Sequence, residues 1–434
     1  MAGERTQSLP VRWRTRRLDE VATIIDSLHT TPTYSETGAA MVRVTDVQGG
    51  FLDISKTLRV AEDIFQEFTR RYTPKRGDIV FSRVGSYGNA SYANTDTPFC
   101  LGQNTALISP RINGRFLHLF LQSAEARSQI EQAVVGSTQK TISLKSISVL
   151  QVPVPPEKEL LAIAHIGGTL DDKIELNRRM NGTLEAMARA LFQSWFVDFD
   201  PVRAKREGHQ PASLDAETAA LFPAAFQDSP LGPIPKGWRV GTLGDLVHLR
   251  TDRVDATPAK DSRRYIALED MPSKSIDLSN FQLGSAVNSS ITSFLKGDVL
   301  FGSMRPYFHK IGLAFFDGIT RTTTFVLRPS KDCFRHFALL HFFSDDVVAF
   351  STTASVGTTI PYVKWDSLKS YQIAIPSDQL LAAFEKMANS LVQLIGAQGD
   401  ESRTLATLRN TLMPKLLSGE LSVAAAAKRV ETGA

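Results

Sequence analysis

Two long stretches of the chain carry apolar residues at alternating spacings of four and three. The seam positions are Ile163, Gly167, Leu170, Ile174, Asn177, Asn181, Leu184, Ala188, Leu191 and Trp195 in the first stretch, and Leu380, Phe384, Met387, Leu391, Leu394, Gln398, Glu401, Leu405, Leu408 and Leu412 in the second. This spacing predicts two helices that pair through a narrow coiled-coil seam. The alternative is an amphipathic helix on its own domain, which needs a wider apolar stripe. Residues 171–173 are polar, as are residues 177–181 apart from Met180, which favours the narrow seam.

Polar residues interrupt both seams near their middles. Asn177 and Asn181 do so in the first helix, and Gln398 and Glu401 in the second. If the helices pack antiparallel, their middles meet. A polar layer at that point would fix their register and orientation at some cost in stability.

The remaining sequence alternates short apolar runs with turns. Gly-Asp followed by an apolar run, at Gly77–Phe81 and again at Gly297–Phe301, reads as a turn that enters a strand. The segments 149–154 and 373–376 alternate apolar and polar residues before a proline. We therefore predict that the stretch of about 150 residues before each long helix forms a domain of short strands, turns and a few helices.

The chain is an internal repeat. The blocks 12–21, 77–81, 104–110 and 135–155 recur in the same order as 237–246, 297–301, 323–329 and 356–376, at an offset near 220 residues. Between the two copies, residues 201–236 are rich in Pro, Ala and Gly and read as a connector. The predicted division is a first domain at 1–157, a central helix at 158–200, a connector at 201–236, a second domain at 237–376, a C-terminal helix at 377–421 and a flexible tail at 422–434.

Composition bounds the function only loosely. The formal net charge of +4 permits nucleic-acid binding without requiring it. The two cysteines, Cys100 and Cys333, are typical of a reducing compartment. Met1–Arg17 holds five arginines and no apolar core of a signal peptide, and no apolar run approaches the ~20 residues of a membrane span. We therefore expect a cytoplasmic protein.

Familiar catalytic motifs are absent from the sequence. There is no phosphate-binding G-x-x-x-x-G-K-[ST] loop, no H-E-x-x-H or Cys/His cluster and no nucleophile elbow. The nearest approach to an amino-methyltransferase motif, Asp200-Pro201-Val202, lacks the second proline and the aromatic residue. We expect a chain with no catalytic residue and no metal site.

Three further segments resemble a known family. Leu191–Lys205, which contains Trp195-Phe196-Val197-Asp198-Phe199-Asp200-Pro201, is similar to the segment after the central helix of type I restriction-modification specificity subunits. Residues 231–238 resemble the start of their second recognition domain, and residues 408–421 their C-terminal helix and tail. With the repeat, these resemblances extend over nearly the whole chain.

The resemblance implies an architecture and a set of partners. The fold would be α+β, with two homologous target-recognition domains joined by two long antiparallel coiled-coil-like helices in a pseudo-two-fold repeat. Each domain would read one half of a split site on double-stranded DNA. Two methyltransferase subunits and restriction subunits would bind the chain. S-adenosylmethionine and ATP with magnesium would belong to those partners, which carry out adenine methylation and restriction.

Within this family context, polar loops that follow or precede strands are the candidate DNA contacts. Arg and Lys suit guanine or phosphate, Asn and Gln suit adenine, and hydroxyl groups suit phosphate. The candidates are Arg83, Ser86, Tyr87, Asn89, Gln103, Asn104, Thr138 and Lys140 in the first domain, and Arg305, Tyr307, His309, Lys310, Arg321, Thr322, Thr358 and Lys364 in the second. Ordinary solvated turns are the alternative reading of these loops. The divergent stretches 43–59 and 263–280 are further candidates for base reading.

Three other functions are compatible with parts of the pattern. The chain could be the specificity subunit of a methylation-only system, which a neighbouring restriction-subunit gene would exclude. It could be a fused methyltransferase or nuclease, which binding of S-adenosylmethionine by the isolated chain would support. A coiled-coil scaffold without DNA contact is the third, and salt-dependent DNA binding by the assembled complex would exclude it.

Overall fold

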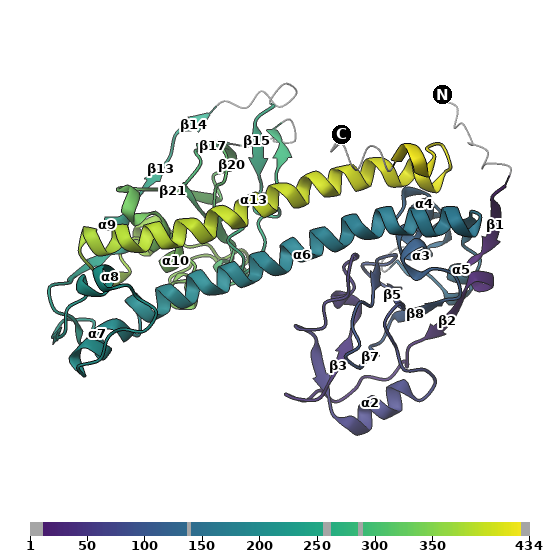
Figure 1. Ribbon diagram of the computed structural model, residues 1–434, viewed down its shortest axis with the longest axis horizontal. Helices are drawn as coiled ribbons and strands as arrows, with labels where there is room; N and C mark the ends of the chain where they lie inside the picture. The colour runs from purple at the N-terminus through teal and green to yellow at the C-terminus, as the bar shows by residue number, and fades with distance from the viewer. Residues whose placement is uncertain (1–11, 137–139, 255–261, 285–289, 427–434) are drawn as a thin grey trace. The chain divides into compact units, whose positions relative to one another are not determined.

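The structure is a computed structural model that describes residues 12–136, 140–254, 262–284 and 290–426. It divides into two compact units (Figure 1). The first unit comprises residues 1–175 and 404–434, and the second comprises residues 176–403. Each long helix therefore contributes one part to each unit.

The first unit is built on a four-stranded antiparallel sheet. Its order is β2-β8-β5-β6, formed by Ala22–Asp26, Thr105–Pro110, Ile79–Ser82 and Ala90–Tyr92. A second sheet has the order β4-β3-β7 (Leu58–Val60, Ala39–Val42, Phe99–Leu101), and β1 (Arg14–Arg17) pairs with β9 (Gln151–Val154). The helices are α1 (Leu18–Val21), η1 (Val44–Asp46), α2 (Glu62–Thr69), α3 (Gly114–Leu121), α4 (Ala124–Ala133) and α5 (Leu144–Ser148).

The second unit repeats this plan. Its four-stranded sheet has the order β13-β21-β18-β19 (Val247–Arg250, Thr324–Pro329, Val299–Gly302, Ile311–Leu313). Its second sheet has the order β14-β17-β20-β15-β16 (Arg253–Val254, Ile291–Phe294, Gly318–Arg321, Arg264–Ile266, Gln282–Leu283), and β12 (Arg239–Thr242) pairs with β22 (Gln372–Ile375). The helices after the connector are α9 (Leu243–Leu246), η4 (Pro306–Phe308), η5 (Asp332–Phe334), α10 (Arg335–Phe342), α11 (Asp345–Thr353) and α12 (Trp365–Leu368).

The connector between the copies is folded against the second unit. It contains α7 (Asp200–Arg206), α8 (Ala216–Ala220) and a small hairpin of β10 (Phe226–Gln227) and β11 (Ile234–Pro235). Val202 and Phe222 are buried in the core of that unit. The segment therefore holds more regular structure than its Pro- and Ala-rich composition suggests.

The two copies also agree in strand register. Ile79 lies opposite Ile108 in the first unit, and Val299 lies opposite Leu327 in the second. In each second sheet one pair is parallel, β3 with β7 and β15 with β20. Because a slip of one residue would turn every apolar side chain to the other face, this agreement means that both copies bury the same positions. The α+β class and the internal repeat expected from the sequence are confirmed.

The two long helices, α6 (Glu157–Phe196) and α13 (Asp378–Leu417), contain 40 residues each (Figure 1). In the first unit, Arg409 Nη1 donates to Asp171 Oδ1 at 2.6 Å. In the second unit, Asn181 Nδ2 donates to the Ile395 carbonyl at 3.1 Å. Residue numbers thus fall along α13 as they rise along α6, so the helices are antiparallel within each unit.

The polar residues in the middle of α6 are buried against α13. Asn177 Nδ2 donates to Glu401 Oε2 at 2.7 Å and lies 3.4 Å from the Gln398 carbonyl oxygen. Asn181 Nδ2 also reaches Asp277 Oδ2 at 3.2 Å. Burial without partners would cost each amide a large desolvation penalty, so these bonds favour one register of the helix pair.

The apolar seam departs from the predicted spacing along α13. Leu394 and Met387, both expected in the seam, are 51% and 38% exposed. The buried positions are instead Ala388, Val392 and Ile395. A Cβ on the neighbouring Gly396 would lie 2.4 Å from the Phe315 ring, which shows how closely α13 packs on its own domain. The wider stripe of a domain-packed helix is therefore correct for this part, and the expectation for Leu394 was wrong.

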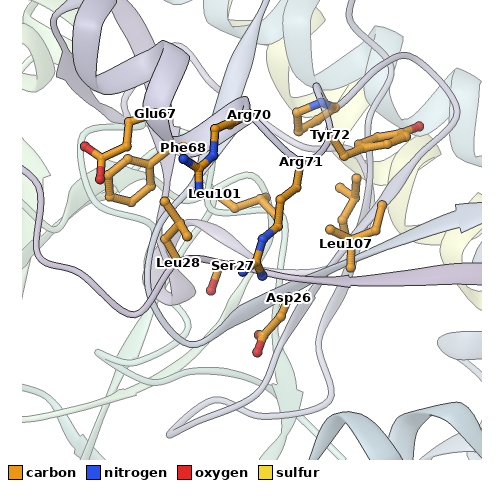
Figure 2. A pocket seen from close by; sticks show the side chains of 12 residues that line it. Asp26, Ser27, Leu28, Glu67, Phe68, Arg70, Arg71, Tyr72, Leu101 and Leu107 are labelled. Atoms are coloured by element: carbon orange, nitrogen blue, oxygen red, sulfur yellow. The ribbon is translucent and has the colours of Figure 1, made fainter.

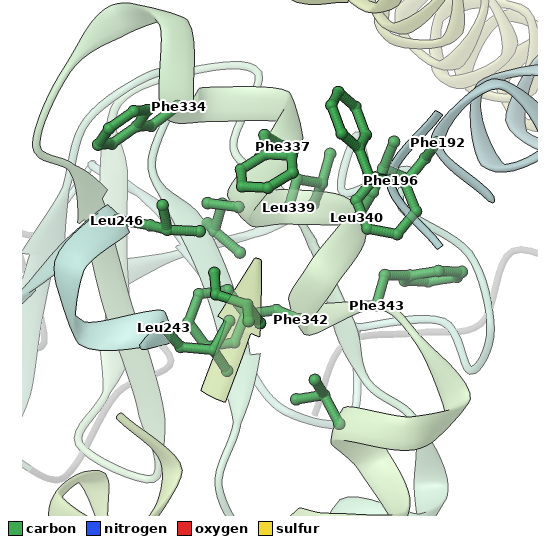
Figure 3. Packing of buried hydrophobic residues seen from close by; sticks show 14 of the residues in the cluster. Phe192, Phe196, Leu243, Leu246, Phe334, Phe337, Leu339, Leu340, Phe342 and Phe343 are labelled. Atoms are coloured by element: carbon green, nitrogen blue, oxygen red, sulfur yellow. The ribbon is translucent and has the colours of Figure 1, made fainter. Parts of the chain in front are cut away.

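The remaining pairing residues lie on or beside the buried face. Leu170 and Leu412 are buried, and six others are partly buried, namely Ile174, Leu184, Leu191, Leu391, Leu405 and Leu408. The end of α6 enters the largest apolar core of the second unit (Figure 3). There Phe196 meets Phe384 edge-on with a centroid distance of 4.8 Å, and Trp195 meets Phe222 at 5.0 Å. Trp195 and Phe196 are thus core residues of this unit.

Candidate nucleic-acid interface

Three loops of the first unit, far apart in sequence, meet beyond the ends of β5 and β8. The Arg83 amide donates to the Asn104 carbonyl at 2.9 Å, and the Ile142 amide donates to the Arg83 carbonyl at 3.0 Å. Val84 also forms a β-bridge with Thr141. We call the segments 83–89, 102–104, 135–136 and 140–142 the first loop cluster. Thr138, one of the predicted contacts, lies outside the described residues.

The second unit forms the same arrangement from equivalent loops. The Ser303 amide donates to the Thr323 carbonyl at 3.0 Å, and the Val363 amide donates to the Ser303 carbonyl at 3.0 Å. Met304 forms a β-bridge with Tyr362. We call the segments 303–310, 321–323 and 356–364 the second loop cluster. The sequence predicted these loops separately, and the structure brings each set of three together.

These backbone bonds also fix which residues correspond. Arg83 and Ser303 make the same two bonds, so they are counterparts. Arg305 donates its amide to the Pro361 carbonyl, as Gly85 does to the Lys140 carbonyl. Arg83 and Arg305, the two arginines proposed to read DNA, therefore occupy different positions in their clusters.

Several predicted contacts of the first cluster are used inside the unit. The Arg83 guanidinium, with a side-chain exposure of only 14%, pairs with Asp26 at 2.5 Å. The Tyr87 ring is buried and its hydroxyl donates to Glu131 at 2.7 Å. Asn89 Nδ2 donates to the Val47 carbonyl at 3.2 Å. Because these groups already have internal partners, we remove Arg83, Tyr87 and Asn89 from the candidate contact surface.

Other side chains of the first cluster face solvent. Ser86, Asn104 and Lys140 are exposed, and Gln103 is partly exposed with a 3.2 Å bond to Thr31. Asn104 holds a positive φ of 64°, a conformation that asparagine tolerates better than most residues. An amide and a hydroxyl group therefore remain available on this surface. The exposed Lys140 ammonium group lies 3.4 Å from the Tyr87 hydroxyl oxygen and 4.0 Å from a Glu131 carboxylate oxygen, so it is only partly engaged inside the unit.

The second cluster divides in the same way. His309 is buried and its Nε2 lies 2.8 Å from the Phe343 carbonyl oxygen, while Lys310 Nζ donates to the Leu268 carbonyl at 2.8 Å. Burial lowers the pKa of His309, so the ring stays neutral at pH 7 and offers no positive charge to phosphate. Arg321 is partly buried, and its Nε has no hydrogen-bond partner among the described residues. His309 and Lys310 are therefore also removed from the contact surface, whereas Arg321 stays a partly buried candidate.

The exposed residues of the second cluster form a more cationic surface than those of the first. They are Arg305, Tyr307, Thr322, Thr358 and Lys364. Two exposed apolar rings that the sequence analysis did not select, Phe308 and Tyr362, belong to the same cluster. From sequence alone, an aromatic residue in a loop can equally be a buried core residue. Only the exposed fractions of the Phe308 and Tyr362 side chains in the structure show that these two rings face solvent.

A small cavity lies beside the first cluster (Figure 2). Asp26, Ser27 and Arg71 line it, and its volume is about 20 Å³. Such a space accommodates about one water molecule, which would satisfy the buried Ser27 hydroxyl that has no partner among the described residues. The cavity is too small for a nucleotide or a cofactor.

Two kinds of feature are absent from the part of the chain that the structure describes. No group of three or more His, Cys, Asp or Glu side chains is placed to hold a metal ion in the described ranges. No helix among the same residues is long and apolar enough to cross a membrane.

Comparison with known proteins shows what the chain is similar to. Residues 10–186 match the type I restriction modification DNA specificity domain. The chain is 25% identical over 403 residues to the type I restriction enzyme HindI specificity subunit of Haemophilus influenzae, covering 80% of this chain and 87% of that one. It is 24% identical over 383 residues to the MjaIX specificity subunit of Methanocaldococcus jannaschii, covering 84% and 82%.

The fold is similar to that of a solved structure. The S subunit of a type I restriction-modification system from M. genitalium superposes with a TM-score of 0.55 at 15% identity, covering 95% of this chain and 98% of that one. The chain therefore carries a type I restriction modification DNA specificity domain at residues 10–186, and over most of its length it is similar to type I restriction enzyme specificity subunits.

Proposed function

We propose that the chain reads a split site on double-stranded DNA, with one half-site read by each loop cluster. The observation that carries this proposal is the repeat of one loop arrangement with different exposed side chains. Equivalent backbone bonds hold both clusters. The first presents Ser86, Asn104 and Lys140, and the second presents Arg305, Thr322 and Lys364. Two copies of one scaffold with different polar groups suit the recognition of two different short sequences.

The helix pair supports a fixed spacing between the half-sites. A helix of 40 residues is roughly 60 Å long at a rise of about 1.5 Å per residue. Both α6 and α13 pass from one unit to the other, and the buried Asn177 bonds oppose sliding of one helix along the other. We infer that this pair sets the length of DNA that is left unread.

The catalytic steps are assigned to partner subunits. We propose that two methyltransferase subunits bind this chain and methylate adenine, and that restriction subunits join them. S-adenosylmethionine and ATP with magnesium would be bound by those partners.

The test is DNA binding by the chain assembled with its methyltransferase partner. A Ser86→Glu/Lys140→Glu variant changes the first cluster, and an Arg305→Glu/Lys364→Glu variant changes the second. Each should weaken binding and reduce the dependence on salt, with the log–log slope falling by about 0.9 for each lost phosphate contact. Changing bases in one half-site should then weaken binding only by the variant that keeps the cluster which reads that half-site.

The matched controls are Lys75→Glu and Lys296→Glu. Both lysines are exposed and lie just before β5 and β18, at the ends of these strands away from the loop clusters. The controls should keep the affinity and salt dependence of the wild type. Equal losses in controls and cluster variants would mean that general charge, and not the loop clusters, governs binding.

A further inference from the structure

The loop between β18 and β19 in the second cluster has a backbone that few side chains adopt. Arg305 has a φ of 48° and His309 a φ of 52°, and neither is glycine. Residues between them form the 3-10 turn Pro306–Phe308. Left-handed conformations of non-glycine residues persist only where the surroundings impose them, and they gather at functional sites.

The surroundings hold both ends of this turn. Pro306 is buried, and the Arg305 amide donates to the Pro361 carbonyl at 2.7 Å. At the other end, the buried His309 ring lies 2.8 Å from the Phe343 carbonyl oxygen and edge-on to the Phe343 ring. The Lys274 amide donates to the His309 carbonyl at 3.0 Å. The turn is therefore rigid at its base.

Two aromatic rings project from this rigid base. Tyr307 is 49% exposed and Phe308 is 45% exposed, and their ring centroids are 4.8 Å apart. Burying these rings in the unit would stabilise it, since each aromatic side chain covers a large apolar area. Keeping two adjacent rings exposed on a strained, anchored turn indicates that they are covered by a ligand.

The equivalent loop of the first unit, residues 83–88, has no such pair and is described throughout. This loop is one residue shorter, because Asn89 bonds with Ser82 as Lys310 bonds with Gly302. The ring of Tyr87 is buried there, and the next residue is Gly88. The aromatic pair is thus a property of the second cluster alone.

The charges near the pair favour DNA over an apolar protein surface. Arg305 and Lys364 of the same cluster are exposed, and no ion pair of either is found among the described residues. The nearby carboxylate of Asp345 lies 3.5 Å from Lys274 Nζ. Proteins that insert a wedge between base pairs and bend the duplex use apolar side chains for the wedge and nearby cationic side chains to contact the DNA.

We propose that Tyr307 and Phe308 form an aromatic wedge that unstacks one base step in the second half-site, while the first half-site is read without such a distortion. This inference rests on the proposed function, because it requires that the second cluster contact DNA. It adds that part of the specificity comes from how easily one base step opens, which depends on its sequence.

The experiment uses the chain assembled with its methyltransferase partner and duplexes that contain the mapped site. 2-Aminopurine replaces, one at a time, each adenine of either half-site that is neither the methylated base nor its neighbour, because extrusion of the methylated adenine by the partner would itself unstack that neighbour. Unstacking raises the fluorescence of this base. The wild type should give a several-fold rise at one step of the second half-site and none in the first. Tyr307→Ala/Phe308→Ala should abolish the rise and weaken binding of the complete site by about 10-fold.

Two matched variants make the result specific. Tyr307→Phe/Phe308→Tyr keeps both rings and should keep the rise. Leu295→Ala removes an apolar side chain that is 47% exposed at the other end of β18, and it should behave as the wild type. Retained sensitivity of the alanine variant to changes in the first half-site reports that the protein is folded.

Three outcomes would overturn the wedge. They are a rise that persists in the alanine variant, tight binding by the wild type without any rise, and loss of assembly with the methyltransferase subunit in the alanine variant alone, which would make the pair a protein-docking surface. Failure of the proposed function is a separate result, since the wild type would then be insensitive to base changes in both half-sites.

Discussion

The two units share a backbone but differ in what they expose. The order β2-β8-β5-β6 in one is the order β13-β21-β18-β19 in the other, and the same hydrogen bonds join the three loops of each cluster. Yet the position that holds Arg83 in one holds Ser303 in the other, and Gly85 corresponds to Arg305. The core fixes where the loops lie, whereas the exposed side chains are free to differ. This is the expected pattern for two readers of different sequences on one scaffold.

The largest effect is expected from breaking the connection between the two readers. Inserting four residues after Asn181 shifts α6 by about one turn and interrupts its pairing with α13. Methylation at the original site should be lost, or should move to a site with a different gap. Mapping methylated adenines in cells that carry the variant and the methyltransferase gene checks this outcome. Full activity at the unchanged gap would contradict a rigid spacer.

A second change should destabilise the second unit and leave the stability of the first unit unchanged. Trp195 is 2% exposed and packs against Phe222 and Phe384 in the second unit. Trp195→Ala should cost about 3–5 kcal/mol there, because a cavity replaces a large ring. Hydrogen exchange should become faster in β18 and β21 while β5 and β8 keep their protection. Equal loss of protection in both units would mean that they unfold as one body.

A third change sharpens the difference between the loop clusters. Arg305 is exposed, whereas the Arg83 guanidinium is paired with Asp26. Arg305→Ala should weaken binding by roughly 1–3 kcal/mol and relax the second half-site only, if it reads a base. Arg83→Ala should lower the stability of the first unit and leave base preference unchanged. Competition binding with base-substituted duplexes, together with thermal unfolding, separates the two results. If Arg83→Ala relaxed the reading of the first half-site, Arg83 would belong to the DNA-contact surface after all.

The smallest effect concerns acid stability. Burial lowers the pKa of His341 to about 3, below its value of about 6.5 in the unfolded chain. The contribution of the neutral His341 ring to the free energy of unfolding is therefore complete above pH 6.5. It declines as the pH falls below that value, because His341 gains a proton in the unfolded state and not in the folded state. His341→Phe should remove about 1 kcal/mol of this loss at pH 6. Urea unfolding at pH 6 and pH 8 measures the difference, and an equal effect at both pH values would contradict this assignment.

The sequence predicted the repeated framework because that framework depends on local patterns. Gly-Asp turns, alternating strands and the interrupted seam placed the loops and the buried asparagines near their observed elements. It did not predict which loop side chains are free. Asp26, which pairs with Arg83, lies 57 positions away in the sequence. Nothing in the residues around Asp26 indicates that its carboxylate forms this ion pair. The exposed Leu394 was misjudged for a related reason, since only the tertiary packing of Phe315 beside Gly396 decides which stripe of α13 is buried.

Methylation mapping of DNA from cells that contain this chain and its methyltransferase partner tests the central claim most directly. The account predicts one split motif, with two different specified halves and a gap of constant length. It further predicts that Arg305→Glu/Lys364→Glu degrades only one half of that motif and that Ser86→Glu/Lys140→Glu degrades only the other. A continuous motif, or degradation of both halves by either double variant, would contradict the claim that each unit reads its own half-site.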